Sequence, residues 1–115
     1  MVAYRITDAA KRDFGMVLRE TRERFGAQQR DIYKALIARA VEMVAADPAR
    51  GGSWDRGSIV PGLRAFHLDH AAGRRGAAAH TLYYALNQQA GEPPVVVVLR
   101  LLPEKMEPDR RIPQG

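Results

Sequence analysis

The chain has 115 residues, of which 18 are basic, 13 are acidic and none is cysteine, and its formal net charge is +5. This length predicts a single domain over residues 1–115, and the lack of cysteine excludes a disulfide framework and a thiolate zinc site. The opening residues lack the pattern of a signal peptide, and the longest apolar run, Val95–Leu99, is too short to span a bilayer. We therefore expect a cytoplasmic protein with no membrane segment, no metal and no cofactor.

Arginine dominates the positive charge, with fifteen arginines against three lysines. The guanidinium group makes two-point contacts with carboxylates and phosphates, so a basic surface of this kind indicates an acidic partner, either nucleic acid or an acidic protein. A genome rich in codons for arginine and alanine would produce the same composition. Charge alone leaves these interpretations open.

The N-terminal segment alternates in polarity over Val2–Ile6, which predicts a short first strand. Thr7 and Asp8 are good helix-capping residues, and the helical pattern that follows them ends at Gly26, a natural helix stop. The apolar face of this first helix has members at spacings of three and four: Ala10, Phe14, Val17, Leu18, Thr21 and Phe25.

A second helix is predicted over residues 28–46. Asp47 and Pro48 end it, because the residue before a proline avoids helical geometry. The very short break at Gly26 predicts that the two helices form an antiparallel hairpin.

The apolar stripe on this second helix is wider than one packing contact needs: Ile32, Tyr33, Leu36, Ile37, Ala40, Met43 and Val44. Tyr33, Ile37 and Val44 cannot all face the same core as the rest of the stripe. Either part of the stripe is an exposed binding surface, or the helix is wedged between the first helix and the sheet.

The second half of the chain has the pattern of a loop followed by strands. Residues 49–62 are predicted to be a loop, in which Trp54 is either a lid over the helix–sheet junction or a base-stacking residue. Three strand segments and a charged tail follow: Leu63–Asp69, His80–Asn87, Val95–Leu102 and residues 103–115. The predicted fold class is α+β in the order β-α-α-β-β-β, an N-terminal strand and an antiparallel helical hairpin packed on a mainly antiparallel four-stranded sheet.

Short motifs spread along the chain carry a resemblance to a known family. They are Tyr4-Arg5-Ile6-Thr7, Phe25-Gly26, Pro61–Phe66, His80–Tyr84 and Met106–Ile112. In their order and spacing they resemble the ParE/RelE superfamily of bacterial toxins, over nearly the whole chain. The departure is Asp69–Ala79, a longer hairpin connection than the superfamily usually shows.

The resemblance implies a toxin of a type II toxin–antitoxin system. RelE-like members cut messenger RNA on the ribosome, whereas ParE-like members, which serve in plasmid stabilisation, poison DNA gyrase. In the RelE-like nucleases an arginine commonly stands where this chain has Thr81, and a histidine or tyrosine stands near the place of Pro103. The resemblance therefore favours a ParE-like gyrase inhibitor that is not itself a catalyst, with a RelE-like ribosome-dependent mRNA endonuclease as the alternative.

The same resemblance implies a partner, a cognate antitoxin with a DNA-binding domain and an acidic, partly disordered tail that folds on binding. A homodimer and a heterotetramer with the antitoxin are both compatible with it. The expected antitoxin-binding residues combine the apolar stripe with two strand arginines: Tyr33, Ile37, Val44, Arg64 and Arg100.

Arg64 and Arg100 have two interpretations. They form either a basic patch on the open face of the sheet that binds an acidic segment, or ion-paired structural arginines. The expected target-binding surface adds the tail to them: Arg64, Arg100, Met106, Arg110 and Arg111. The competing view is that Met106 and Ile112 pin the tail over the core, so that its removal would unfold the protein.

The histidines are weak candidates for a metal site, and a basic loop is a weak candidate for target binding. His67, His70 and His80, with Asp69, lack the spacing of a metal site, and we interpret them as polar strand and loop residues. Arg74-Arg75, flanked by glycines, is either a solvated loop tip or a flexible basic loop that reaches an acidic target.

Overall fold

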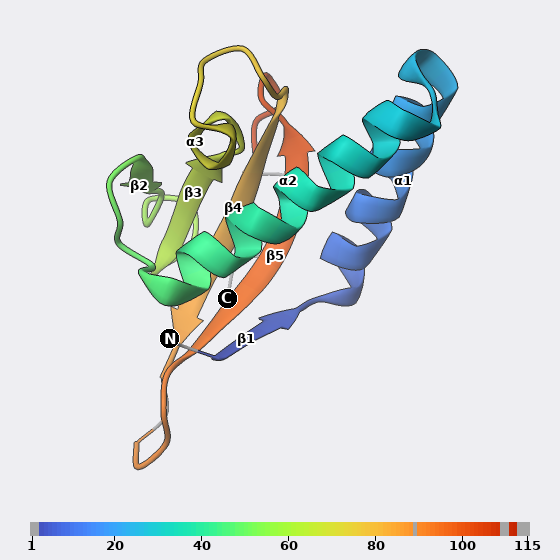
Figure 1. The fold of residues 1–115 in the computed structure, drawn as a ribbon. Helices are drawn as coiled ribbons and strands as arrows, with labels where there is room; N and C mark the ends of the chain where they lie inside the picture. Colours follow the sequence, from blue (N-terminus) through green and yellow to red (C-terminus); the bar gives the residue numbers. More distant parts are fainter. Residues whose placement is uncertain (1–2, 89, 109–110, 113–115) are drawn as a thin grey trace.

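A helical hairpin packs on one face of a sheet (Figure 1). The computed structural model describes residues 3–88, 90–108 and 111–112. Over these residues the elements are β1 (Ala3–Ile6), α1 (Asp8–Phe25), α2 (Ala27–Ala46), β2 (Ser53–Asp55), β3 (Leu63–His67), α3 (Asp69–Ala72), β4 (His80–Asn87) and β5 (Val95–Pro103). The sheet has the order β1-β5-β4-β3-β2, and β1 runs parallel to β5 while the other neighbours are antiparallel.

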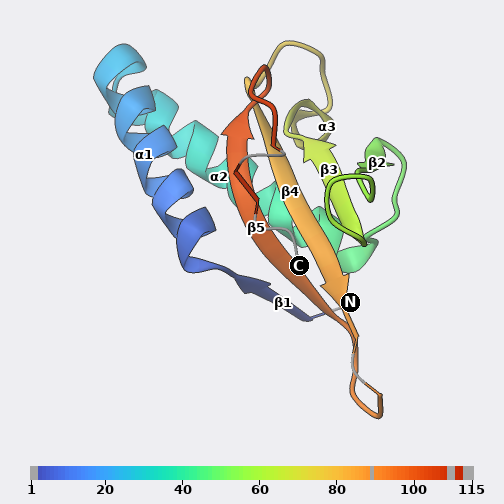
Figure 2. The same cartoon turned by 180° about the vertical axis from the view of Figure 1, so that it is seen from behind.

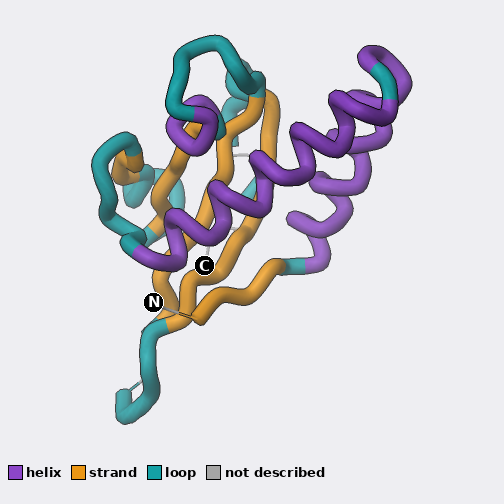
Figure 3. The backbone as a smooth tube through the Cα atoms, in the orientation of Figure 1, coloured by secondary structure: helices purple, strands orange, loops and turns teal. Residues whose placement is uncertain are grey.

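The hairpin begins and turns where the sequence predicts. Thr7 Oγ1 accepts a hydrogen bond from the N–H of Ala10 at 3.1 Å, and its hydroxyl donates to the carbonyl of Leu99 at 3.0 Å. A side-chain cap of this kind contributes about 1 kcal/mol, and here it also fixes the start of α1 to β5. Gly26, with φ of 94°, ends α1 in a conformation that favours glycine, and its N–H donates to the carbonyl of Arg22. Figure 3 shows the two helices side by side beyond this turn.

The main core lies between the hairpin and the sheet. Its largest fully buried side chains come from the segment from β3 to β5 and from α2: Phe66, Leu68, Leu82, Tyr84, Leu101, Val44, Val96 and Val98. On α2, Ile37 is 5% exposed and Val44 is 0% exposed, whereas Ile32 is 53% exposed. The helix packs against α1, α3 and β5, so the alternative of a wedged helix describes this part of the stripe, in which Ile37 and Val44 are buried.

A second, smaller core covers the opposite face of the sheet, where five buried residues cluster: Leu63, Ala65, Tyr83, Leu102 and Ile112. In the tail, Ile112 is 3% exposed, Pro108 is fully buried and Met106 packs against the cluster. Figure 2 shows the segment after β5 turning back over this face. The described part of the tail therefore packs over a core, as the competing view of Met106 and Ile112 holds.

The sheet has five strands rather than the four that the sequence predicts. The additional strand, β2, lies within the predicted loop 49–62 and pairs with β3 at the edge of the sheet. It has only three residues, too few for alternation to reveal. The additional helix, α3, is a single turn that begins at Asp69, the last residue of the predicted strand Leu63–Asp69, and otherwise lies in the predicted connection to the next strand. Gly73 caps it in the left-handed conformation.

Candidate functional site

An apolar groove runs between α1, α2 and β1. It encloses about 300 Å³ and is lined mainly by apolar side chains, with one cation and one carboxylate: Tyr4, Ile6, Phe14, Leu18, Lys34, Ile37, Ala38, Val41 and Glu42. Strand β1 is an edge strand that pairs with β5 on one side only, and Tyr4 on it is 46% exposed. A groove of this kind beside an open strand edge can receive the apolar side chains of an extended or helical partner segment.

Arg100 on β5 has a structural role. Its Nε and Nη2 donate to the two carboxylate oxygens of Asp13 at 2.6 and 2.9 Å, and its Nη1 donates to the carbonyl of Arg111 at 2.9 Å. The hydrogen bonds to Asp13 raise the pKa of Arg100 above its ordinary value. Arg100 thus fits the interpretation as an ion-paired structural arginine, because its guanidinium joins α1, β5 and the tail.

Arg64 is also tied within the protein. Its Nη2 donates to Ser53 Oγ at 2.8 Å, and that hydroxyl donates to the carbonyl of Arg50 at 2.6 Å. Strand β4 separates Arg64 on β3 from Arg100 on β5, and the two arginines bind partners on different elements. Each of these two arginines thus has its own partner within the protein, and their joint role in binding an acidic segment stays a prediction.

Three tail residues belong to the expected target-binding surface. Met106 is partly buried against the second core, and Arg111 is exposed. Arg110 lies outside the described residues. The structure thus leaves the Arg111 side chain accessible and gives Met106 a packing role.

A tyrosine–histidine pair joins α2 to β4. The Tyr33 hydroxyl accepts a hydrogen bond from the N–H of Ala79 at 3.2 Å, and it shares a second hydrogen bond with Nδ1 of His80, 2.6 Å away. Burial lowers the pKa of His80, although the carboxylates of Glu20 and Glu104 act to raise it. Burial raises the pKa of Tyr33.

The pair stands at the wall of a cavity of about 410 Å³ between the helices and the segment before β4, where Glu20, Arg24 and Gln29 also line it. Tyr33 and His80 are 47 residues apart, and neither lies in a motif that links them, so the sequence does not indicate this contact. Tyr33 therefore connects α2 to β4 and to the segment before it, and its contact with the antitoxin stays a prediction.

The residues that were considered for a metal site or for RNA cleavage lie within the fold and make structural contacts there. His67 donates from Nε2 to Glu104 Oε2 at 2.6 Å, and its Nδ1 accepts the N–H of Asp69 at 3.0 Å. Among the residues that the structure describes, no group of three or more histidine, cysteine or acidic side chains could hold a metal ion. Thr81 is 3% exposed, and Pro103 is the last residue of β5.

The fold and its groove define a small basic α+β protein with a surface suited to a partner segment. A family model described as the ParE toxin of type II toxin–antitoxin system, parDE, matches residues 4–108. The chain belongs to this family, and membership implies a cognate antitoxin as its partner. No curated protein matches the chain. Over the described residues, no helix is both long and apolar enough to cross a membrane.

Proposed function

We propose that this toxin inhibits DNA gyrase and that its antitoxin neutralises it by binding in the groove between α1, α2 and β1. Family membership over residues 4–108 supports the activity, because the ParE-like toxins that the chain resembles poison gyrase. The groove is the observation that carries the antitoxin site, since it is apolar, open and adjacent to an unpaired strand edge.

The chemistry of the groove indicates what the antitoxin segment presents. Apolar side chains would enter between Phe14 and Leu18 of α1 and the floor formed by Ile37. Acidic residues of the segment would lie toward Lys34 at the rim, and the net charge of +5 favours an acidic partner in general. Of the expected antitoxin-binding residues, Ile37 lines this groove. Val44 does not line it and is fully buried.

The activity is tested by inducing the toxin alone in a bacterial host and by adding the purified protein to gyrase and supercoiled plasmid. We expect growth arrest, accumulation of cleaved gyrase–DNA complexes, and rescue when the antitoxin is co-expressed. Normal growth on induction would contradict the toxin activity itself. Discrete cuts within translated codons, found by primer extension, would replace gyrase inhibition with the RelE-like activity.

The oligomeric state of the complex stays a prediction. Light scattering on the purified toxin, with and without antitoxin, distinguishes a homodimer from a heterotetramer.

A further inference from the structure

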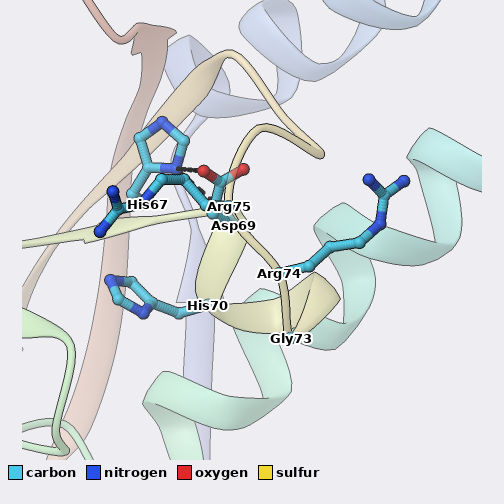
Figure 4. A pocket seen from close by; sticks show the side chains of 6 residues that line it. All are labelled: His67, Asp69, His70, Gly73, Arg74 and Arg75. Atoms are coloured by element: carbon cyan, nitrogen blue, oxygen red, sulfur yellow. Dashed lines mark hydrogen bonds and ion pairs between the residues drawn. The ribbon is translucent and has the colours of Figure 1, made fainter.

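A second cavity lies at the corner where β3 passes into α3 and the connection to β4. It encloses about 580 Å³ and is lined by His67, Asp69, His70, Gly73, Arg74 and Arg75 (Figure 4). This corner is separate from the groove between α1, α2 and β1, and no residue lines both. The proposed antitoxin site uses none of its residues.

The loop that carries the two arginines is held in place by Asp69. One carboxylate oxygen accepts the N–H of Gly76 and the other accepts the N–H of Ala78, both at 2.8 Å. Burial opposes ionisation of this carboxyl, but the backbone hydrogen bonds outweigh it and keep the pKa of Asp69 below its ordinary value. At neutral pH the carboxylate is thus engaged by the loop backbone, and Arg74 and Arg75 project from a fixed turn rather than from a loose tip.

The two imidazoles of the cavity are also fixed. His67 is held through both ring nitrogens, by Glu104 and by the N–H of Asp69. The His70 ring lies 5.4 Å from the ring of Phe66, and it packs so closely on Gly52 that a β-carbon there would come within 2.9 Å of it. Among the hydrogen bonds of the described residues, none uses the ring nitrogens of His70, so this side chain is positioned by packing and its ring nitrogens are open to solvent.

The arginines have no acidic partner within the part of the chain that the structure describes. The ion pairs found there join other residues, and the carboxylates nearest the corner, Asp69 and Glu104, are engaged by the loop backbone and by His67. Figure 4 shows Arg75 extending on the side of the two imidazoles, whereas Arg74 extends to the opposite side. The corner thus presents two unpaired guanidinium groups that diverge from adjacent residues.

We propose that this corner binds the phosphate backbone of a nucleic acid, with Arg75 and His70 on one phosphate and Arg74 on a neighbouring phosphate. A guanidinium and an imidazole N–H on one side of a cavity suit the oxygens of a phosphate group. The divergence of Arg74 from Arg75 suits a polymer that repeats its charge along a strand, rather than a single small anion. The site does not depend on which enzyme the toxin inhibits.

The proposal is tested with the full chain and a short fluorescently labelled DNA duplex, whose binding is followed by anisotropy at several salt concentrations. For Arg75→Ala we expect about tenfold weaker binding. We also expect the plot of log affinity against log salt to become less steep, with a slope smaller in magnitude by about one. His70→Gln should weaken binding in the same direction. Arg39→Ala, which removes an equally charged and exposed side chain from α2, is the matched control and should bind as the wild type does.

Circular dichroism melting of each variant establishes that it is folded, and the imidazole signals of His70 in NMR spectra report where the duplex binds. We expect these signals to move on addition of DNA to the wild type. The proposal is overturned if Arg75→Ala binds as tightly as the wild type, if Arg39→Ala loses as much affinity, or if the His70 signals stay in place. It is also overturned if a polyglutamate peptide binds the corner more tightly than the duplex, because the site would then serve an acidic protein.

Discussion

Arg100 on β5 and Asp13 on α1, 87 residues apart, form a two-point ion pair in which both carboxylate oxygens accept from the guanidinium. Asp13 Oδ2 also accepts the N–H of Leu101 at 3.0 Å. The third guanidinium contact, to the carbonyl of Arg111, extends this connection to the tail. One arginine thus links the hairpin on one face of the sheet to the segment that covers the other face.

Removal of either partner of this pair should destabilise the protein strongly. The Asp13 side chain is 6% exposed, so Arg100→Ala leaves a nearly buried carboxylate without its counter-ion, at a cost of about 3 kcal/mol in the free energy of unfolding. Urea unfolding of Asp13→Ala, Arg100→Ala and the double variant measures the coupling. Arg12→Ala, an exposed arginine on the same helix, is the control, and a loss as large for Arg12→Ala as for Arg100→Ala would contradict this role.

The partly buried His80 should make stability depend on pH. Its pKa in the folded protein lies below the ordinary 6.5, so as the pH falls below that value the unfolded chain takes up a proton before the folded one does. The contribution of His80 to the free energy of unfolding is therefore fully present above the unfolded-state pKa, and it is lost as the pH falls through the folded-state pKa. Urea unfolding from pH about 7.5 to about 5.5 should show this loss.

His80→Gln should remove that component of the pH dependence, because glutamine does not titrate. His70→Gln is the matched control and should retain it. If the wild type and His80→Gln change in parallel over this range, burial does not lower the pKa of His80 in the folded protein.

The tail should contribute to stability as a core element. Ile112→Ala removes apolar atoms from a side chain that is 3% exposed, and we expect a loss of about 3 kcal/mol. A deletion after Glu104 removes Pro108 as well and should unfold the protein or lower its melting temperature sharply. Arg111→Ala is the control and should melt like the wild type, because it removes an exposed side chain and keeps the carbonyl that Arg100 binds. If Ile112→Ala also melts like the wild type, the tail does not contribute to the core.

Local signals in the sequence are sufficient to predict the elements that bear the site. Thr7, Gly26 and Pro48 mark the helix boundaries to within a residue or two, and the predicted strand His80–Asn87 coincides with β4. These predictions succeed because capping, positive φ and the steric effect of proline act between neighbouring residues.

Long-range partnerships are what the sequence leaves open. Alternation on β5 places Arg100 among apolar neighbours but does not reveal that Asp13 binds it, and the tail shows no periodicity although Ile112 is buried. The parallel pairing of β1 with β5 is equally hidden, because period-two patterns define the faces of a strand and not the direction of its neighbour.

The antitoxin groove gives the most direct test of the proposed complex. Ala38→Arg places a long charged side chain in the groove from an exposed position on α2, where arginine is a good helix former, so the fold should be retained. We expect the antitoxin affinity, measured by isothermal titration calorimetry, to fall at least about tenfold because the arginine occupies space that the partner's apolar side chains need. In cells, the antitoxin should no longer rescue growth from this variant.

Ala35→Arg is the matched control, since Ala35 is exposed on the same helix but does not line the groove. It adds the same charge and the same side chain to α2, so it should bind the antitoxin as the wild type does. If both variants bind normally, the antitoxin lies elsewhere on the toxin. If both lose affinity equally, the partner covers a different face of α2, and the groove between α1, α2 and β1 is not its site.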